Sequence, residues 1–582
     1  MDYKPKESVV TDDLKNKFIS RRQLIKAGGL TAAGVAGAAL IGCGSDDEDA
    51  PAASSAASSS SSSSAATQAA TATPTASGLT AAKTAVATQA AAADSGPKKG
   101  GRLIWGTLTP FENYKGPYTS GSVMVPNTSA FWDTLAKYGK DSMEPEPHLA
   151  ESWEFNSDKT QLQVKLRPGL EFHNGKTIDS TAVKRSMDLM DDEGVPNSQV
   201  KGTFSKYISE VKVVDDKTLI FDLAWPGDGI FDVFQYAHIH DADDLESYVD
   251  LKTCNASGPF KFDFDEFKPG EGFLGRRHEN HYAPTHIDEV EFRVFQDASA
   301  LGLAVDAGEI HATNNGTHAD AARWMKDDNL EVGVAPAGLA SWVLGMTVTG
   351  NGGGNPILDD PRVRRAIYRV IDRNRLATET FQGLVEPLHF HWRPYSPAYD
   401  KALDKDYFNI EEAKALLNEA GYDSIDIDLN VQAGGDPADD QIAAVIQADA
   451  AKAGINFNIT LMDGAERRPL WRAGKLPGAY LSSFAFYSLQ PETLAVMNYQ
   501  MRIPNSCAYD TPEYQAIIDG FAGASVEKKA GLIQEMNALY ANEPWIAPIV
   551  SRGYVWANSK KVKGLVTDIL STPYWSELWL DA

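Results

Sequence analysis

Residues 425–461 read IDIDLNVQAGGDPADDQIAAVIQADAAKAGINFNITL, and this stretch indicates the fold class. Apolar and polar residues alternate from Ile425 to Val431, which is typical of a strand. Asp436-Pro437 is typical of a helix start, and Gly454 of a helix end. A second alternating run follows from Ile455 to Leu461. A strand, a helix and a strand within about forty residues predict a βαβ unit with parallel strands and a right-handed crossover.

The chain around this unit changes character near residue 335. Before it, short alternating runs such as Leu162 to Leu166 and Leu219 to Leu223 are separated by turn residues and predict strands. One helix, over about residues 181–190, interrupts them. The first part is therefore predicted to consist mainly of strands and turns.

After about residue 341, capped helices become more frequent. Asp360 precedes Pro361 at one predicted helix start. Asn409 and Glu412 form a capping-box-like pair at the next start, and Gly421 ends that helix. The second part therefore differs in pattern from the first and contains the predicted βαβ unit.

Short strings in a fixed order connect the two parts to one protein family. They are LAESWE (149–154), LRPGLEFHNGK (166–176), SGPF (257–260), DDPRVRRAI (359–367), EEAKALLNEAGY (411–422) and EPWIAP (543–548). Together they resemble the family 5 solute-binding proteins, which serve ABC importers of the peptide/nickel class. The resemblance extends over nearly all of residues 100–582.

This resemblance implies an α/β, two-lobed periplasmic-binding-protein-like fold with an enlarged first lobe and hinge crossings. It implies lobe 1 over residues 99–335, lobe 2 over residues 336–544, and a return to lobe 1 over residues 545–582. The implied function is to enclose a small, peptide-like solute between the lobes and to deliver it to the transmembrane permease. Ligand contacts with both lobes favour a closed state that the permease recognises. The resemblance also implies a monomer.

Residues 1–43 have the marks of an export signal. Arg21 and Arg22 precede Leu-Ile-Lys and an apolar run, which resembles a twin-arginine signal. The ending Leu-Ile-Gly-Cys resembles a lipobox, and by that resemblance Cys43 is the lipidated first residue of the mature protein. A transmembrane anchor is the alternative, but the apolar run has only about 15 residues where a span needs about 20. We expect an extracytoplasmic protein, in the periplasm or on the outer face of the membrane, anchored by the lipid.

Residues 44–98 are rich in serine, alanine and threonine and almost lack large apolar side chains. Such a composition cannot bury enough apolar surface to offset the entropy of ordering. A disordered tether with a reach of about 40 Å is therefore predicted.

The net charge of −25 argues against nucleic acid or an anionic membrane surface as the main partner. It suits a protein that stays soluble in an extracellular medium. Apart from Cys43, the chain has only Cys254 and Cys507, and their spacing leaves open whether they form a disulfide.

The candidate ligand-binding residues lie in segments that correspond, in order, to cleft segments of the family. Two stretches of lobe 1 (107–118 and 127–132), the loop 386–394 and the segment 483–492 are rich in aromatic and amide groups, which can stack on and hydrogen-bond a polar ligand. The residues assigned on this basis are Asn127, Trp132, His391, Trp392, Arg393, Phe484, Phe486 and Tyr487. The alternative is that the loop packs on its own lobe and that Trp132 belongs to the core.

One departure from the family concerns the ligand. Peptide binders usually carry an aspartate for the ligand's amino terminus in the segment that corresponds to residues 483–492. This chain has Leu489-Gln490-Pro491 there, which argues against ordinary peptides unless Glu492 substitutes. Oligosaccharides and metal chelates stay open as alternative ligands.

The sequence contains no convincing catalytic or metal-binding pattern. In His278-Glu279-Asn280-His281 the histidines are three apart, whereas a zinc helix needs four. No G-x-S-x-G motif occurs. The pairs His238/His240 and His389/His391 offer two ligands each, too few for a metal site. We expect no enzyme activity, no cofactor and no metal, with a secreted enzyme on the same lobes as the alternative.

Overall fold

The computed structural model describes residues 96–114, 125–191, 195, 206–334, 340–485 and 489–581. All of them belong to one structural unit, residues 91–582. The predicted signal, with Arg21, Arg22 and Cys43, lies outside the described residues, as does most of the predicted tether.

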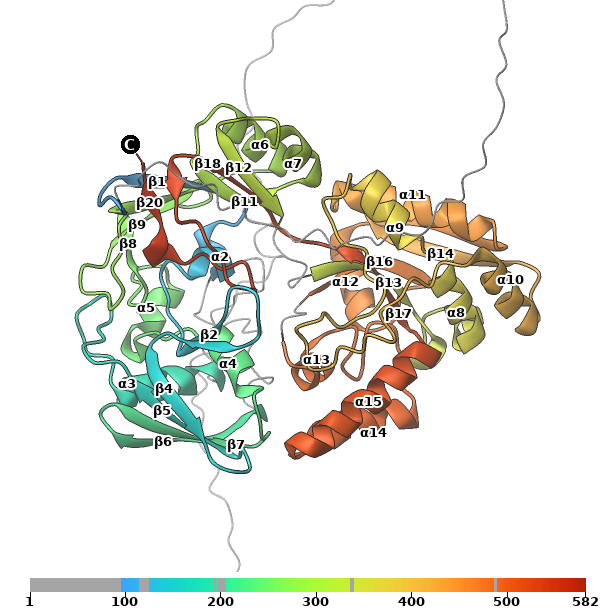
Figure 1. The fold of residues 1–582 in the computed structure, drawn as a ribbon, viewed down its shortest axis with the longest axis horizontal. Helices are drawn as coiled ribbons and strands as arrows, with labels where there is room; N and C mark the ends of the chain where they lie inside the picture. Colours follow the sequence, from blue (N-terminus) through green and yellow to red (C-terminus); the bar gives the residue numbers. More distant parts are fainter. Residues whose placement is uncertain are drawn as a thin grey trace, which may run out of the picture. The chain divides into compact units, whose positions relative to one another are not determined.

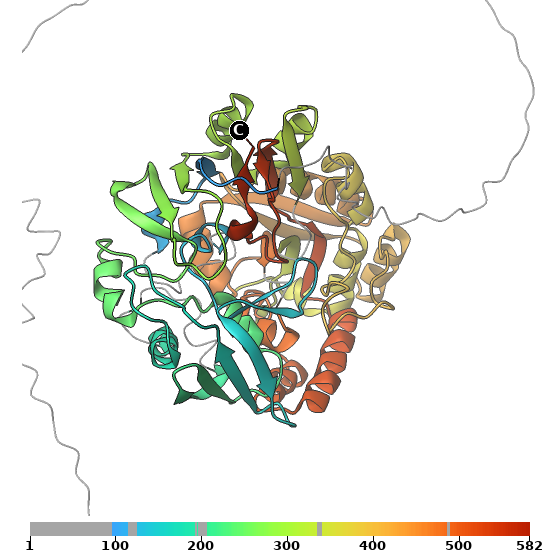
Figure 2. The ribbon, with the colours of Figure 1, turned by 60° about the vertical axis from the view of Figure 1, so that its left-hand side comes forward.

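A seven-stranded mixed sheet forms the base of lobe 1. Its strands, in spatial order, are β12 (Leu330–Val334), β18 (Val555–Ser559), β11 (Ala312–Gly316), β1 (Arg102–Thr107), β10 (Glu289–Val294), β9 (Gly272–Arg277) and β8 (Phe260–Lys268). β1 runs parallel to β10 and β11, and β18 pairs antiparallel with β11 and β12. Both ends of the described chain therefore meet in one lobe, and the dark red C-terminal strands lie beside blue β1 in Figure 1 and Figure 2.

Smaller sheets and short helices complete lobe 1. A four-stranded antiparallel sheet has the order β4 (Ala150–Phe155), β5 (Gln161–Leu166), β7 (Thr218–Leu223) and β6 (Ile208–Asp215). Two-stranded sheets pair β2 (Ala136–Tyr138) with β3 (Pro145–Pro147), and β19 (Val562–Lys563) with β20 (Trp579–Leu580). The helices are α2 (Val125–Thr128), α3 (Ser180–Asp188), α4 (Ile230–Tyr236), α5 (Leu245–Val249), α6 (Ala298–Asp306) and α7 (His318–Trp324). The strands predicted from the alternation at 162–166 and 219–223 are confirmed as β5 and β7, and the helix predicted near 181–190 is α3.

Lobe 2 is built on a five-stranded sheet. Its order is β15 (Ile455–Met462), β14 (Ile425–Gln432), β16 (Ala479–Ala485), β13 (Ala340–Met346) and β17 (Ile546–Ser551). The helices are α8 (Pro361–Arg369), α9 (Arg373–Arg375), α10 (Ile410–Glu419), α11 (Pro437–Ala451), α12 (Gly464–Arg472), α13 (Pro491–Met497), α14 (Pro512–Phe521) and α15 (Val526–Asn542).

The predicted βαβ unit is confirmed as β14, α11 and β15. β14 and β15 are parallel, with Ile425 opposite Ile455. The Asp436 side chain accepts a hydrogen bond from the backbone N–H of Ala438 and so caps α11, where Pro437 occupies the first turn. The apolar residues of β14 are buried, as are Ile442 and Ile446 of the helix; each such burial contributes about 1.5–3 kcal/mol.

The other two predicted helix starts are also capped by an Asp or Asn side chain. Asp360 caps α8, with Pro361 in its first turn. Asn409 accepts a hydrogen bond from the backbone N–H of Glu412 at 3.0 Å and caps α10. Gly421 has a φ of +91°, a left-handed conformation that a glycine adopts without steric cost, and this ends the helix.

The chain crosses between the two large sheets twice. It leaves β12 at Val334 and enters β13 at Ala340, and it leaves β17 at Ser551 and enters β18 at Val555. Because β17 pairs with β13 of lobe 2, the return to lobe 1 falls after Ser551 and not at residue 545.

Cys254 and Cys507 are both free and buried. They belong to different apolar cores, and burial raises the pKa of the Cys507 thiol to about 12. Within the described ranges, every helix falls short of the length and apolarity that crossing a membrane requires.

Candidate ligand-binding site

The carboxyl ends of β1 and β11 lie side by side at one edge of the lobe 1 sheet. In open α/β sheets, ligands bind outside the carboxyl ends of parallel strands. β1 ends at Thr107, whose hydroxyl oxygen accepts a hydrogen bond from the side-chain amide of Asn127 at 2.8 Å. The structure thus places Asn127, a predicted ligand-binding residue, at this edge, although its side chain is buried.

Asn314 of β11 is the most informative polar residue near this edge. It is 1% exposed, and neither of its side-chain amide atoms has a hydrogen-bond partner among the described residues. Ala312 is in register with Trp105 of β1, so strand alternation puts Asn314 on the face that carries Trp105. A buried polar group left without a partner costs about 1–3 kcal/mol. Asn314 is therefore suited to hydrogen-bond a ligand that enters here.

Two buried indole rings lie on the same face of the lobe 1 sheet. The rings of Trp105 and Trp556 are 5.5 Å apart, edge to face, and their Nε1 groups have no hydrogen-bond partner within the described ranges. Trp575 packs against Trp105 at 5.2 Å. Aromatic faces beside amide groups are the lining that small-molecule sites commonly use. Sequence reasoning did not single out Asn314, Trp105 or Trp556, and both tryptophans belong to an apolar core cluster of lobe 1.

In lobe 2, the structure brings two of the predicted residues together. The His391 ring lies 5.6 Å from the Phe484 ring and 4.1 Å from the Tyr540 ring. All three are buried, and burial lowers the pKa of His391 to about 3, so its imidazole is neutral. Phe484 is near the end of β16, whose last residue pairs with Ala340, the first residue after a hinge crossing.

The neighbouring loop residues have partners within lobe 2. The Trp392 indole N–H donates to Asn537 Oδ1 at 2.7 Å, and Asn537 in turn donates to the carbonyl of Ala398 at 2.9 Å. Arg393 forms an ion pair with Glu386. These contacts hold the loop on its own lobe, as the alternative considered above requires. Phe486 and Tyr487 lie outside the described residues.

Glu492, the possible substitute for the missing aspartate, also has a partner within the protein. Its carboxylate is 5% exposed and accepts a hydrogen bond from the Lys529 ammonium at 3.0 Å. A buried carboxylate that already has a cationic partner is poorly placed to hold a ligand's amino group.

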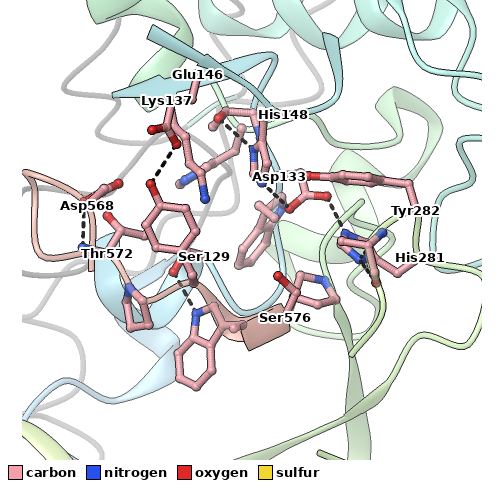
Figure 3. Close-up of a pocket in the computed structure, with 18 of the residues that line it drawn as sticks. Ser129, Asp133, Lys137, Glu146, His148, His281, Tyr282, Asp568, Thr572 and Ser576 are labelled. Carbon is pink, nitrogen blue, oxygen red and sulfur yellow. Dashed lines mark hydrogen bonds and ion pairs between the residues drawn. The ribbon is translucent and has the colours of Figure 1, made fainter. Parts of the chain in front are cut away.

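Trp132 lies apart from the lobe 2 residues, in the wall of a cavity of about 200 Å³ within lobe 1 (Figure 3). Its indole N–H donates to His240 Nδ1 at 3.2 Å, and its ring stacks on His238 at 5.9 Å. Burial lowers the pKa of His240 to about 4. The tryptophan is thus a core residue that also lines a cavity.

A buried carboxylate between two histidines forms one side of this cavity. Asp133 accepts from His281 Nε2 at 2.8 Å, and His148 Nε2 lies 3.3 Å from its other oxygen. Burial alone would raise the pKa of Asp133, but His148 and His281 outweigh it, and the pKa is lowered. Burial lowers the pKa of His148 to about 3, whereas the nearby Asp133 raises the pKa of His281 despite burial. The arrangement is therefore an Asp133–His281 ion pair with a neutral His148.

The opposite side of the cavity carries Lys137, whose ammonium lies 3.4 Å from the centre of the Tyr574 ring. Burial lowers the pKa of this lysine. Asp568 is buried beside it, and burial raises the pKa of Asp568 to about 6. The cavity is small, is lined by both apolar and polar side chains, and is confined to lobe 1.

Metal coordination finds no support in the part of the chain that the structure describes. No group of three or more His, Cys, Asp and Glu side chains there could hold a metal ion. His389 is 4.0 Å from Asp406, and its partner in sequence, His391, packs on aromatic rings.

The chain belongs to the bacterial extracellular solute-binding proteins, family 5, because the model of that family matches residues 144–502. This confirms the resemblance seen in the sequence and makes the protein an extracytoplasmic solute-binding protein of the ABC-importer type. Heme-binding protein A of Haemophilus influenzae is 23% identical over 480 residues, which cover 77% of this chain and 86% of that protein. The dipeptide-binding protein of Escherichia coli is 26% identical over 384 residues, covering 60% and 69%.

Solved structures share the fold. The substrate-binding protein CtaP of Listeria monocytogenes superposes with a TM-score of 0.73 at 20% identity, covering 83% of this chain and 100% of that one. NikA of Brucella suis, in complex with Fe(III)-EDTA, has a TM-score of 0.71 at 19% identity and the same coverage. DppA of Helicobacter pylori, in complex with the peptide STSA, has a TM-score of 0.66 at 20% identity, covering 83% and 99%. The implied two-lobed α/β fold is confirmed.

Proposed function

We propose that this protein captures a small peptide-like solute between its lobes and delivers it to the permease of an ABC importer while a lipid on Cys43 keeps it at the membrane. The proposed binding site rests on one observation. The Asn314 side chain is buried, has no hydrogen-bond partner among the described residues, and lies on the same sheet face as Trp105 and Trp556. Relatives named as binders of dipeptides and glutathione support a peptide-like ligand.

The site itself favours a ligand with polar groups and an apolar body. The Asn314 side chain offers two N–H donors and one acceptor oxygen, and each indole offers one N–H donor. A ligand with a carbonyl or carboxylate oxygen would satisfy these donors, and the rings would cover its apolar part. The partnered state of Glu492 disfavours a free amino terminus in that part of the protein, so a blocked or modified peptide suits the site better than a simple one.

A second candidate ligand class is metal chelates. NikA, with its bound Fe(III)-EDTA, has the same fold. Chelates with several carboxylates need no metal ligand from the protein, which agrees with the lack of a three-ligand cluster in the described ranges. Oligosaccharides are the third class, for which the aromatic surface is the only support.

The test combines native mass spectrometry of the purified full chain with a thermal-shift screen. The screen uses di- and tripeptides, glutathione, oligosaccharides and Fe(III)-EDTA. A true ligand at a hundred times its Kd should stabilise the fold by about 2.7 kcal/mol and raise Tm. No shift with any class, together with no co-purified mass, would contradict the solute-capture proposal. Turnover of a bound compound would favour the enzyme alternative.

Site variants locate the ligand once the screen finds one. Asn314→Ala should weaken binding by at least tenfold, because the ligand loses buried hydrogen bonds worth about 1.4 kcal/mol or more. Asn418→Ala, on the exposed face of α10, is the matched control and should bind like the wild type. If both variants bound the ligand with equal affinity, the ligand would not bind at the carboxyl end of β11.

A further inference from the structure

A buried aspartate of lobe 1 holds the start of a lobe 2 helix. Asp232, in α4, is fully buried. Its Oδ1 accepts from the Tyr138 hydroxyl at 2.5 Å. Its Oδ2 accepts from the backbone N–H of Gln490 at 2.9 Å and from the Thr493 hydroxyl at 2.5 Å. Tyr138 belongs to lobe 1, whereas Gln490 and Thr493 belong to lobe 2 at the beginning of α13.

Other contacts join the lobes at the same place. The hydroxyls of Tyr207 and Thr493 are 2.5 Å apart. The Lys529 ammonium of α15 donates to the carbonyl of Pro226 at 2.5 Å. Figure 1 shows α4 and α13 on facing sides of the two lobes. The junction therefore consists of buried polar contacts within an apolar cluster to which both lobes contribute.

We propose that Asp232 is a positioning residue for ligand capture. Its two oxygens are taken by protein donors, and it is inaccessible, so it acts without touching the ligand. It holds the first turn of α13 against lobe 1 when the lobes close, and so it sets the equilibrium between open and closed states. This inference rests on the lobe closure that the proposed function requires.

The charges around Asp232 make this equilibrium sensitive to pH. Tyr138, Tyr207 and Tyr236 face it from lobe 1, and Glu492, paired with Lys529, faces it from lobe 2. Burial raises the pKa of Asp232 to about 7, with a smaller contribution from Glu492 that the three hydrogen bonds only partly offset. When the lobes separate, Gln490 and Thr493 leave, and a solvated aspartate has a pKa of about 3.9.

The direction of the effect follows from linkage. Because the pKa is higher in the closed state than in the open state, closing takes up a proton between about pH 4 and pH 7. The closed state is therefore favoured at low pH and loses this advantage as the pH rises through about 7. The ratio of closed to open molecules should be roughly tenfold higher at pH 6 than at pH 8. Protonated Asp232 keeps its partners, since the Thr493 and Tyr138 hydroxyls can also accept a hydrogen bond.

The test measures lobe closure in the ligand-free full chain by single-molecule fluorescence transfer. Val214 in lobe 1 and Leu461 in lobe 2 are 55% and 65% exposed, and each is replaced by p-acetylphenylalanine to carry a dye. The wild type should show the tenfold change between pH 8 and pH 6. Asp232→Asn, neutral at every pH, should show less than a twofold change.

Asp568→Asn is the matched control. Asp568 is also buried, with a pKa raised to about 6, but among the described residues its hydrogen-bond donors, Gln235, Leu570 and Thr572, all belong to lobe 1. This variant should keep the pH response of the wild type. A wild type with less than a twofold change, or an Asp232→Asn variant that keeps the full response, would overturn the inference.

A second variant covers the case in which Asp232→Asn does not fold. Thr493→Val removes one cross-lobe donor and should lower the closed fraction at both pH values, and an unchanged closed fraction would contradict the proposal. A pH-dependent closure in a protein for which the ligand screen fails would support the inference about Asp232 while contradicting the proposed ligand.

Discussion

Most buried charged side chains in this protein have hydrogen-bond or ion-pair partners within the protein. We call such residues framework residues, to separate them from residues that could bind a ligand. Asp133 and Asp232 each accept two or three hydrogen bonds or ion-pair contacts. Asn314 has none among the described residues. A residue that already has its partners stabilises the lobes, whereas a buried polar residue without partners is available to a ligand.

His281→Ala tests the framework role of the Asp133–His281 pair. The variant leaves a buried carboxylate without its cation, so we expect a loss of about 3–5 kcal/mol in the free energy of unfolding, measured by urea denaturation. The exposed pair Lys184–Asp188 provides the control, and Lys184→Ala should have no measurable effect.

The same pair predicts a pH dependence. Asp133 raises the pKa of His281 above its ordinary value of 6.5, so the ion pair contributes fully below pH 6.5 and is lost as the pH rises through the raised pKa. The stability difference between wild type and His281→Ala should therefore be larger at pH 6 than at pH 9. An equal difference at both pH values would show that the histidine is neutral.

At the scale of the element, the βαβ unit of lobe 2 is the part that local sequence specified most completely. Its helix cap, its proline in the first turn and its alternating strands all agree with the final structure. The sheet in which it sits was not predicted in detail, because β13 and β17 come from distant parts of the chain.

Ile446→Ala tests how much this unit contributes to stability. Ile446 of α11 is fully buried, and removing its side chain leaves a cavity, so we expect a loss of about 2–5 kcal/mol. Leu461→Ala on β15, with Leu461 65% exposed, should change stability by less than about 0.5 kcal/mol. If chemical denaturation gave similar losses in the free energy of unfolding for the two variants, packing of α11 would not be what stabilises the lobe 2 core.

At the scale of the whole molecule, function depends on two lobes joined by two chain crossings. The proposed function requires the lobes to move relative to each other while the two crossings, after Val334 and after Ser551, keep them joined. The predicted lipid at Cys43 would keep this binding unit close to the permease, since a tether limits the volume in which the unit moves.

Cys43→Ala tests the membrane tether. The variant should be exported but recovered in the soluble fraction, with the same Tm as the wild type, because the position lies outside the folded unit of residues 91–582. Replacing Arg21 and Arg22 by lysine should instead keep the precursor inside the cell. A Cys43→Ala protein that still sediments with membranes would contradict the lipid anchor.

The sequence by itself determined the family, the two α/β parts and the local elements. The short family motifs in their fixed order and the helix caps are local sequence signals, so they can be recognised without knowledge of tertiary contacts. The predicted binding residues do not come together in one site. Asn127 lies at the edge of the lobe 1 sheet, His391 and Trp392 are buried within lobe 2, and Trp132 lines a cavity in lobe 1.

Only the tertiary structure decided which polar groups lack partners and which residues join the lobes. Asn314 becomes notable because β1 and β18 flank β11, and Asp232 because α13, far away in sequence, places Gln490 and Thr493 against it. Burial and hydrogen bonding depend on neighbours contributed by distant segments, so no local pattern in the chain could reveal either residue.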